Sequence, residues 1–393
     1  MRQISILLGA GFSVPDKYPT RWGVNERLSK IDASEIMVHT GGAALFLNGQ
    51  EDVNAHWMGL DERNFIQQFL EFYNSEILGD DEFDYEEFFD FYHGLLKGKT
   101  KSEKFETFAE EFRSKQTIPT DNTNLISRFH NSFNQLLGSL LTRWPEQVHL
   151  AKPYTKYGEF LTMIELLKSQ YETIHIHTLN HDLLLEELSH SDAMVGDFCD
   201  GYELYGTPFF GMFKEIYPVR LKHFTNNFDK KIRLYKLHGS IDSYIYNFQN
   251  KEYNSIRRLP GVEIDSLKKE YYDENGNLKV DNCWWNYYPD FLSGTTEKIE
   301  RYKDIHYYAE IFKHFEANLK NSDRLITIGY GLGDSKINEF IEENLLSSKE
   351  KKALIIDPKK NDNKIYDFES VEYYGDGLGV SDIDLKRIEE FIK

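Results

Sequence analysis

The sequence predicts an α/β fold: a Rossmann-like parallel sheet with helices on both faces and a large helical insertion. Short apolar, β-branched runs alternate with segments of helical periodicity at the N-terminus and again after Tyr157. Between these parts, from about residue 31 to residue 152, apolar residues recur at helical spacing with little alternation of period two. We therefore expect one domain formed by residues 1–28 and 153–393, and a helical insertion formed by residues 29–152.

The first predicted strand, residues 4–8, runs directly into a glycine-containing turn, Gly9-Ala10-Gly11-Phe12-Ser13. Such a break after a buried strand is typical of a turn that holds phosphate, because a side chain would keep the backbone away from a pyrophosphate. An ordinary tight turn would have the same pattern. Pro15, Pro19 and Gly23 then predict an irregular loop, able to close over a nucleotide, before a helix that starts at Asn25.

Helical periodicity in the insertion is clearest in residues 64–78, 83–96, 105–112 and 122–144. The acidic, aromatic segment at residues 80–90 contains enough carboxylates for a metal site. Its spacing instead favours an amphipathic helix with a solvated acidic face, because hard cations need ligands that converge from a turn.

The C-terminal half predicts further strands at residues 172–179, 232–237, 324–331, 353–358 and 371–374. Helices are predicted at residues 160–168, 183–188, 336–346 and 383–392. In such a sheet, ligands bind at the carboxyl ends of the strands. Residues 202–229 and 244–299 have no clear period, and we interpret them as insertions that form the wall of the pocket or contact other subunits.

Composition excludes several classes of function. The 46 basic and 65 acidic residues give a net charge of −19, which repels a polyanion, so we expect no direct binding of nucleic acid. No apolar run reaches about 18 residues and no secretory signal is present, so we expect a cytoplasmic protein without a membrane span. Cys199 and Cys283 are the only cysteines, which excludes a four-thiolate zinc site within one chain.

Polar residues follow two of the later predicted strands. Asn180 and Asp182 come after the first, and His238 comes after the next. A neutral imidazole near pH 7 is suited to act as a general base. A His before Gly-Ser could also simply cap a turn, and His181 could be a solvent-facing neighbour of Asn180.

Four motifs together resemble the sirtuin-like family of NAD-consuming enzymes. They are Gly9-Ala10-Gly11-Phe12-Ser13, Thr178-Leu179-Asn180-His181-Asp182, His238-Gly239-Ser240, and Ile328-Gly329-Tyr330-Gly331-Leu332-Gly333-Asp334 followed by Ile356-Asp357. The resemblance covers the first strand and roughly residues 155–375. It implies that residues 1–28 and 153–393 form an NAD-binding catalytic domain.

The resemblance also implies roles for single residues. Asn180, with Asp182 behind it, would hold the nicotinamide ribose and a water, and His238 would be the general base. The NAD pyrophosphate would lie on the first turn, and Asp357 would accept from the adenosine ribose, although Asp-Pro could also be only a strand-to-turn signal. The implied NAD-binding residues are Gly9, Ala10, Gly11, Phe12, Ser13, Ser240, Gly329, Asp334 and Asp357.

The chain departs from the deacylase members of this family, which carry two thiol pairs around zinc. The zinc-less, helix-rich branch is similar to bacterial anti-phage effectors that destroy NAD+. We therefore expect an NAD+ glycohydrolase that releases nicotinamide and ADP-ribose without a metal. One alternative is a deacylase or ADP-ribosyltransferase, which the missing thiol pairs disfavour. Another is a module that only senses NAD or ADP-ribose, which the presence of both Asn180 and His238 disfavours.

Control of such an activity is expected to come from assembly, because the last predicted strand lies shortly before Lys393 and leaves no separate sensor domain. We expect a homo-oligomer and an operon-encoded regulatory partner. Analogy with the family suggests a HerA-type ATPase as that partner.

Overall fold

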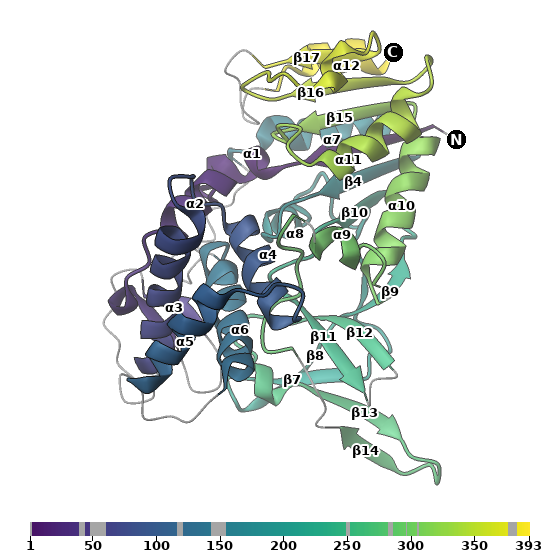
Figure 1. Ribbon diagram of the computed structural model, residues 1–393. Helices are drawn as coiled ribbons and strands as arrows, with labels where there is room; N and C mark the ends of the chain where they lie inside the picture. The colour runs from purple at the N-terminus through teal and green to yellow at the C-terminus, as the bar shows by residue number, and fades with distance from the viewer. Residues whose placement is uncertain are drawn as a thin grey trace. The chain divides into compact units, whose positions relative to one another are not determined.

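The computed structural model describes residues 2–38, 44–47, 60–115, 121–142, 155–248, 252–281, 286–295, 297–304, 306–375 and 383–393 (Figure 1). The chain divides into two compact units. The first comprises Met1–Tyr18, Trp144–Asn286 and Arg301–Lys393, and the second comprises Pro19–Arg143 and Tyr287–Glu300. Contacts alone define these units, so the two functional domains named above stay a prediction.

The first unit is built on a seven-stranded sheet whose paired strands run parallel, in the order β17-β16-β15-β1-β4-β10-β5. The predicted α/β class with a Rossmann-like sheet is thereby confirmed. The strands are β1 (Gln3–Leu8), β4 (Thr173–Thr178), β5 (Phe198–Cys199), β10 (Ile232–Lys236), β15 (Arg324–Ile328), β16 (Lys352–Ile356) and β17 (Val371–Tyr374).

Successive side chains of the central strands point to opposite faces of this sheet, and both sets are buried, so helices cover both faces. Ile4 and Ile6 of β1 belong to an aliphatic core shared with α7 (Gly158–Gln170) and α12 (Leu385–Ile392). The opposite face includes His177 of β4, whose ring lies 4.8 Å from that of Phe315 on α10 (Tyr308–Asn321). The predicted placement of helices on both faces is confirmed.

Two small antiparallel sheets occupy the segment for which the sequence showed no period. One has the order β11-β12-β9-β6 and the other β14-β13-β7-β8. Strands such as β8 and β14 are largely exposed, so they lack the in-and-out alternation that predicts a strand. The strands are β6 (Gly201–Glu203), β7 (Phe209–Phe213), β8 (Tyr217–Arg220), β9 (His223–Asn227), β11 (Ser243–Phe248), β12 (Glu252–Arg257), β13 (Lys268–Tyr272) and β14 (Leu278–Asp281).

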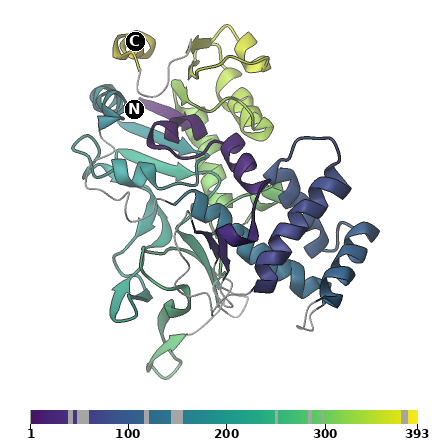
Figure 2. The same ribbon diagram turned by 90° about the vertical axis from the view of Figure 1, so that its left-hand side faces the viewer.

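The second unit is mainly helical (Figure 2). A core rich in Phe, including Phe69, Phe88 and Phe129, lies between its helices, as the helical spacing predicts. A short hairpin of β2 (Ile36–Val38) and β3 (Ala44–Phe46) accompanies them. The helices are α2 (Arg21–Leu28), α3 (Leu60–Phe72), α4 (Tyr85–Leu96), α5 (Glu103–Ser114) and α6 (Asn122–Leu140).

Three expectations for this unit need correction. The segment before Asn25 was expected to be irregular, yet α2 starts at Arg21 because the Thr20 hydroxyl accepts from the Gly23 amide. The last helix of the insertion ends at Leu140, and the expected end at Trp144 lies outside the described residues. The acidic segment at residues 80–90 was expected to be a helix with a solvated acidic face. Instead α4 begins at Tyr85, and Asp84 caps this helix and pairs with Arg21.

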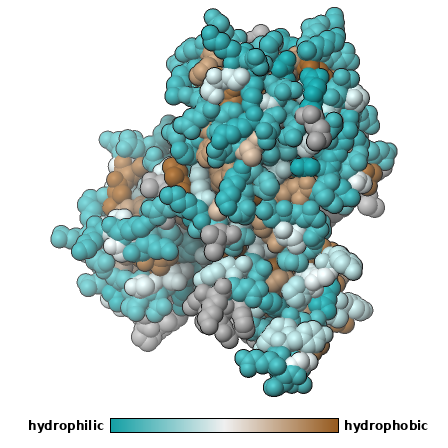
Figure 3. Space-filling model, turned by 90° about the vertical axis from the view of Figure 1, so that its right-hand side faces the viewer, coloured by the Kyte–Doolittle hydropathy of each residue, from teal (hydrophilic) through white to brown (hydrophobic). Residues whose placement is uncertain are grey.

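The surface is mostly hydrophilic on the face seen in Figure 3, and its apolar residues are scattered. No helix among the described parts of the chain has the length and apolar character needed to cross a bilayer.

Candidate active site

The carboxyl ends of three neighbouring strands bring the predicted site residues to one edge of the sheet. β4 pairs with β1 on one side and with β10 on the other, and Thr178 is level with both Leu8 and Lys236. The residues that follow these strands are therefore neighbours. Gly9 follows β1, Asn180 follows β4 and His238 follows β10, as the pattern predicted.

The glycine turn is shaped by close contact with the loop after β15. The amides of Gly9 and Gly11 donate to the carbonyls of Ile328 and Gly329, at 3.1 and 2.9 Å. A Cβ on Gly9 would lie 2.4 Å from the Cα of Tyr330. Gly9 and Gly11 are thus needed for backbone packing, and their amides already have acceptors within the protein. Binding of a pyrophosphate by this turn stays a prediction.

Phe12 and Ser13 of the same turn have different surroundings. The Phe12 ring is buried and packs against Tyr157 and Phe160, with centroids 5.2 and 4.8 Å away. Ser13 is also buried, and its hydroxyl oxygen accepts from the Asn180 side chain. Of the two side chains, only Ser13 reaches another predicted site residue.

Asn180 joins the first and second strand ends. Its Nδ2 donates to the Gly9 carbonyl and to Ser13 Oγ, both at 2.9 Å. Both amide hydrogens are thereby used inside the protein, so a contact with a ligand would come from Oδ1. The Asn180 backbone amide donates to Thr178 Oγ1 at 3.1 Å, which fixes the start of the loop.

Asp182 is buried on the loop that carries Asn180. Burial raises the pKa of Asp182, while Lys236, the Ser13 hydroxyl and the Leu184 amide act in the opposite direction. The Leu184 amide donates to Asp182 Oδ1 at 3.0 Å at the start of α8 (Leu184–Leu188). Asp182 therefore supports Ser13 and the loop end.

His238 lies beside Asp334, apart from the contacts of Asn180, Ser13 and Asp182 described above. Nε2 of His238 lies 3.6 Å from Oδ2 of Asp334, and both side chains are 9% exposed. Asp334 is the N-cap of α11 (Ser335–Ile341), with Oδ1 accepting from the amides of Lys336 and Ile337. The cap fixes the carboxylate, which can orient the imidazole and stabilise its protonated form.

Ser240 and Asp357 are engaged with backbone groups. Ser240 is buried and donates to the His181 carbonyl at 3.5 Å. Asp357 accepts from the Gly331 and Lys359 amides at 3.0 and 3.1 Å, so it holds the loop after β15. Binding of NAD by these side chains stays a prediction, and the turn role considered for Asp357 is present.

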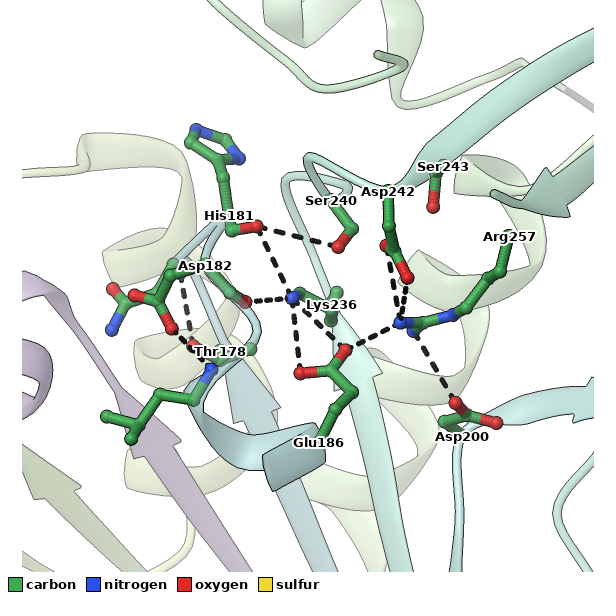
Figure 4. Close-up of polar contacts among 12 residues, drawn as sticks. Thr178, His181, Asp182, Glu186, Asp200, Lys236, Ser240, Asp242, Ser243 and Arg257 are labelled. Carbon is green, nitrogen blue, oxygen red and sulfur yellow. Dashed lines mark hydrogen bonds and ion pairs between the residues drawn. The ribbon is translucent and has the colours of Figure 1, made fainter. Parts of the chain in front are cut away.

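Sequence reasoning missed a buried ionic network beneath these loops (Figure 4). Lys236 and Arg257 share the carboxylate of Glu186, at 3.2 and 2.7 Å. Arg257 also pairs with Asp242 and Asp200. The one available signal was the position of Lys236 just before Leu237-His238. A lysine at the end of a strand is usually exposed to solvent, so its position alone did not indicate a buried ion pair.

No group of three or more His, Cys, Asp or Glu among the described residues could hold a metal ion. Cys199 lies on β5, where burial raises the pKa of its thiol to about 11. Cys283 lies outside the described residues.

A parallel sheet with a glycine turn after β1 and polar side chains at its carboxyl edge defines an α/β domain of the nucleotide-binding class. Residues 174–374 match the model of the SIR2-like domain family. The chain belongs to this family, which confirms the resemblance to the sirtuin-like group.

Solved structures with similarity to the chain include sirtuins. A structure of Sir2 bound to acetylated peptide has a TM-score of 0.38 and 11% identity, covering 99% of this chain and 93% of that one. A Sir2 homolog in complex with NAD has a TM-score of 0.39 and 11% identity, covering 100% and 91%. No curated protein matches the sequence.

Proposed function

We propose that this chain is an NAD+ glycohydrolase that cleaves NAD+ to nicotinamide and ADP-ribose. Membership of the SIR2-like family supports an NAD-dependent activity. The observation that carries the proposal is the position of Asn180 and His238 on adjacent loops, held together through the His181 carbonyl. A binding module needs neither a fixed amide nor a His beside a carboxylate.

The proposed reaction breaks the bond between nicotinamide and the ribose, and nicotinamide leaves with the bonding electron pair. The oxygen of a water bonds to the anomeric carbon, and His238 accepts the proton that this water loses. Asp334 stabilises the protonated His238. Asn180 Oδ1 orients the ribose or the water, because its Nδ2 is fixed on Gly9 and Ser13.

The biological role is inferred from the resemblance alone: an effector of bacterial anti-phage defence that acts by NAD+ depletion. Control by assembly into a homo-oligomer and by an operon-encoded partner, with a HerA-type ATPase as the candidate, belongs to the same proposal. Hydrolysis needs only water as the acceptor, so no metal and no acylated peptide are required.

Chromatography of the products tests this proposal. The purified chain is incubated with NAD+, alone and with the product of its operon neighbour, each with and without an acylated peptide. We expect nicotinamide and ADP-ribose in equal amounts without the peptide, and the same rate in a chelator. Nicotinamide release that requires the peptide would indicate a deacylase. Binding of NAD+ without nicotinamide release in any mixture would indicate a sensing module.

A further inference from the structure

Lys236, the last residue of β10, connects the two loops that carry Asn180 and His238. Its side chain is almost fully buried, and its Nζ donates to the carbonyls of both His181 and Asp182 (Figure 4). These carbonyls belong to the loop that starts with Asn180. Because Lys236 itself precedes His238 by two residues, its side chain spans from one loop to the other.

The His181 carbonyl is the point where the loops meet. It accepts from the Ile241 amide at 3.0 Å and from Ser240 Oγ at 3.5 Å, in addition to Lys236. Hydrogen bonds with a charged donor are stronger than those between neutral groups. Loss of the ammonium would leave buried carbonyl groups of the Asn180 loop without their charged donor.

The charge of Lys236 is balanced by a carboxylate that it shares with a second cation. Glu186 of α8 contacts Lys236 at 3.2 Å and Arg257 of β12 at 2.7 Å. Burial alone would raise the pKa of Glu186, but the two cations hold it below its ordinary value. Glu186 is therefore ionised at neutral pH, and its negative charge is shared between the positive charges of Lys236 and Arg257.

Arg257 brings the small antiparallel sheet into the same network. It comes from the end of β12, pairs with Asp242 at 3.1 Å and with Asp200 at 3.6 Å, and stacks 4.5 Å from the Tyr202 ring centroid. Tyr202 lies on β6, so two strands of this sheet converge on the arginine. A change in this sheet can therefore reach the Asn180 loop through the shared carboxylate of Glu186.

We propose that Lys236 is a positioning residue that clamps the Asn180 loop to the His238 loop, and that Glu186 makes this clamp depend on Arg257 in the small sheet. Its kinetic consequence rests on the proposed NAD+ hydrolysis. The clamp itself does not. A displacement of the small sheet by a partner would then loosen the reacting groups without any contact to the substrate.

The test compares Lys236→Met, Glu186→Gln and Arg257→Met with the control Lys320→Met, which removes an exposed lysine from α10. Two readouts are combined: hydrogen–deuterium exchange of the amides in residues 179–184 and 237–241, and kcat and KM for NAD+. We expect Lys236→Met to speed exchange in both segments at least about tenfold. We expect kcat to fall about 10- to 100-fold, with a smaller change in KM, because misplacement of reacting groups by about 1 Å has effects of this size.

Double variants separate a clamp from general support of the fold. If Arg257 acts through Lys236, Lys236→Met combined with Arg257→Met should reduce kcat no further than Lys236→Met alone. A purely structural role predicts additive losses that follow the fraction of folded protein. Should Lys236→Met not fold, Glu186→Gln gives the same comparison with a nearly isosteric side chain.

Parental exchange in both segments of a folded Lys236→Met or Glu186→Gln protein would overturn the proposal. This result does not depend on hydrolysis, so it is distinguishable from failure of the proposed function. Absence of NAD+ hydrolysis in the parent, with faster exchange in the variants, would retain the clamp and refute the enzyme.

Discussion

Asn180 has a structural role that also sets the geometry of its proposed role in the reaction. Its amide group ties the β4 loop to the Gly9 turn, and the same two hydrogen bonds aim its remaining oxygen. Position and chemistry are therefore coupled in one side chain. An amide can donate both of these hydrogen bonds, whereas an ionised carboxylate can donate neither.

We predict that Asn180→Asp is more damaging than its small change in volume suggests. The carboxylate cannot donate to the Gly9 carbonyl, and Asp182 lies on the same loop. Turnover of NAD+ should fall by about 10² to 10³, and the free energy of unfolding by about 1–3 kcal/mol. Asn275→Asp, in an exposed turn, is the matched control. Parental turnover in Asn180→Asp would remove this residue from the mechanism.

The residues that sequence analysis found and those that it missed differ in a physical way. Asn180, His238 and Asp334 each follow an apolar run, where a polar side chain is conspicuous. Glu186 and Arg257 lie far apart in sequence, in segments that predict solvated charges. Their ion pair joins β12 to α8, and no local sequence pattern encodes such a contact.

At the scale of elements, the Gly9 turn and the loop after β15 can approach each other closely because the contacting residues are glycines without side chains. Gly329 has φ +62°, and a Cβ there would lie 2.5 Å from the Phe12 nitrogen. Gly333, four residues on, has no atom within 4 Å of such a Cβ. A side chain can therefore be accommodated at Gly333 but not at Gly329 without movement of the backbone.

We predict that Gly329→Ala lowers the free energy of unfolding by about 1–3 kcal/mol, because the backbone of one loop must move away from the other. Gly333→Ala should change it by less than about 0.5 kcal/mol. Chemical denaturation of both variants measures the difference. Equal stability of the two would show that the close approach of the loops is not required.

The N-terminus of α4 in the second unit should be sensitive to acid. Burial alone would raise the pKa of Asp84, but the hydrogen bond and charge of Arg21, with Asn25 and the Glu86 amide, hold it below its ordinary value of 3.8. A carboxylate with a lowered pKa contributes stability above its unfolded pKa, and this contribution is lost as the pH falls through the folded pKa.

We predict that Asp84→Asn destabilises the protein at pH 7 by up to about 1 kcal/mol, since Arg21 is half exposed and solvent screens the pair. The difference from the parent should shrink once the pH drops below about 3.8. Urea denaturation across this range measures it, with the exposed Asp80→Asn as control. A difference that is constant with pH would contradict the assigned ion pair.

At the scale of the whole molecule, the fold class could be predicted because the central strands are buried on both faces and read as continuous apolar runs. The antiparallel sheets could not. Residues such as Tyr217 and Leu278 are exposed, so hydrophobic alternation is absent along their strands. The polar edge of the main sheet followed directly from the predicted strand ends.

Control of a toxic activity is predicted to require association of the chain. We expect light scattering to detect a homo-oligomer at micromolar concentration, and activity per subunit to rise with assembly or with the operon-encoded partner. Dilution series that measure mass and NAD+ turnover on the same samples test this. A monomer with full activity in the absence of any partner would refute it.

The central claim is that His238 is the general base of NAD+ hydrolysis, and paired measurements on His238→Ala test it most directly. Thermal melting and release of nicotinamide are recorded on one preparation, with the exposed His190→Ala as control. We predict a turnover lower by about 10² to 10⁴ with a melting temperature that keeps the protein folded at the assay temperature. A folded His238→Ala protein that releases nicotinamide at the parental rate would contradict the account.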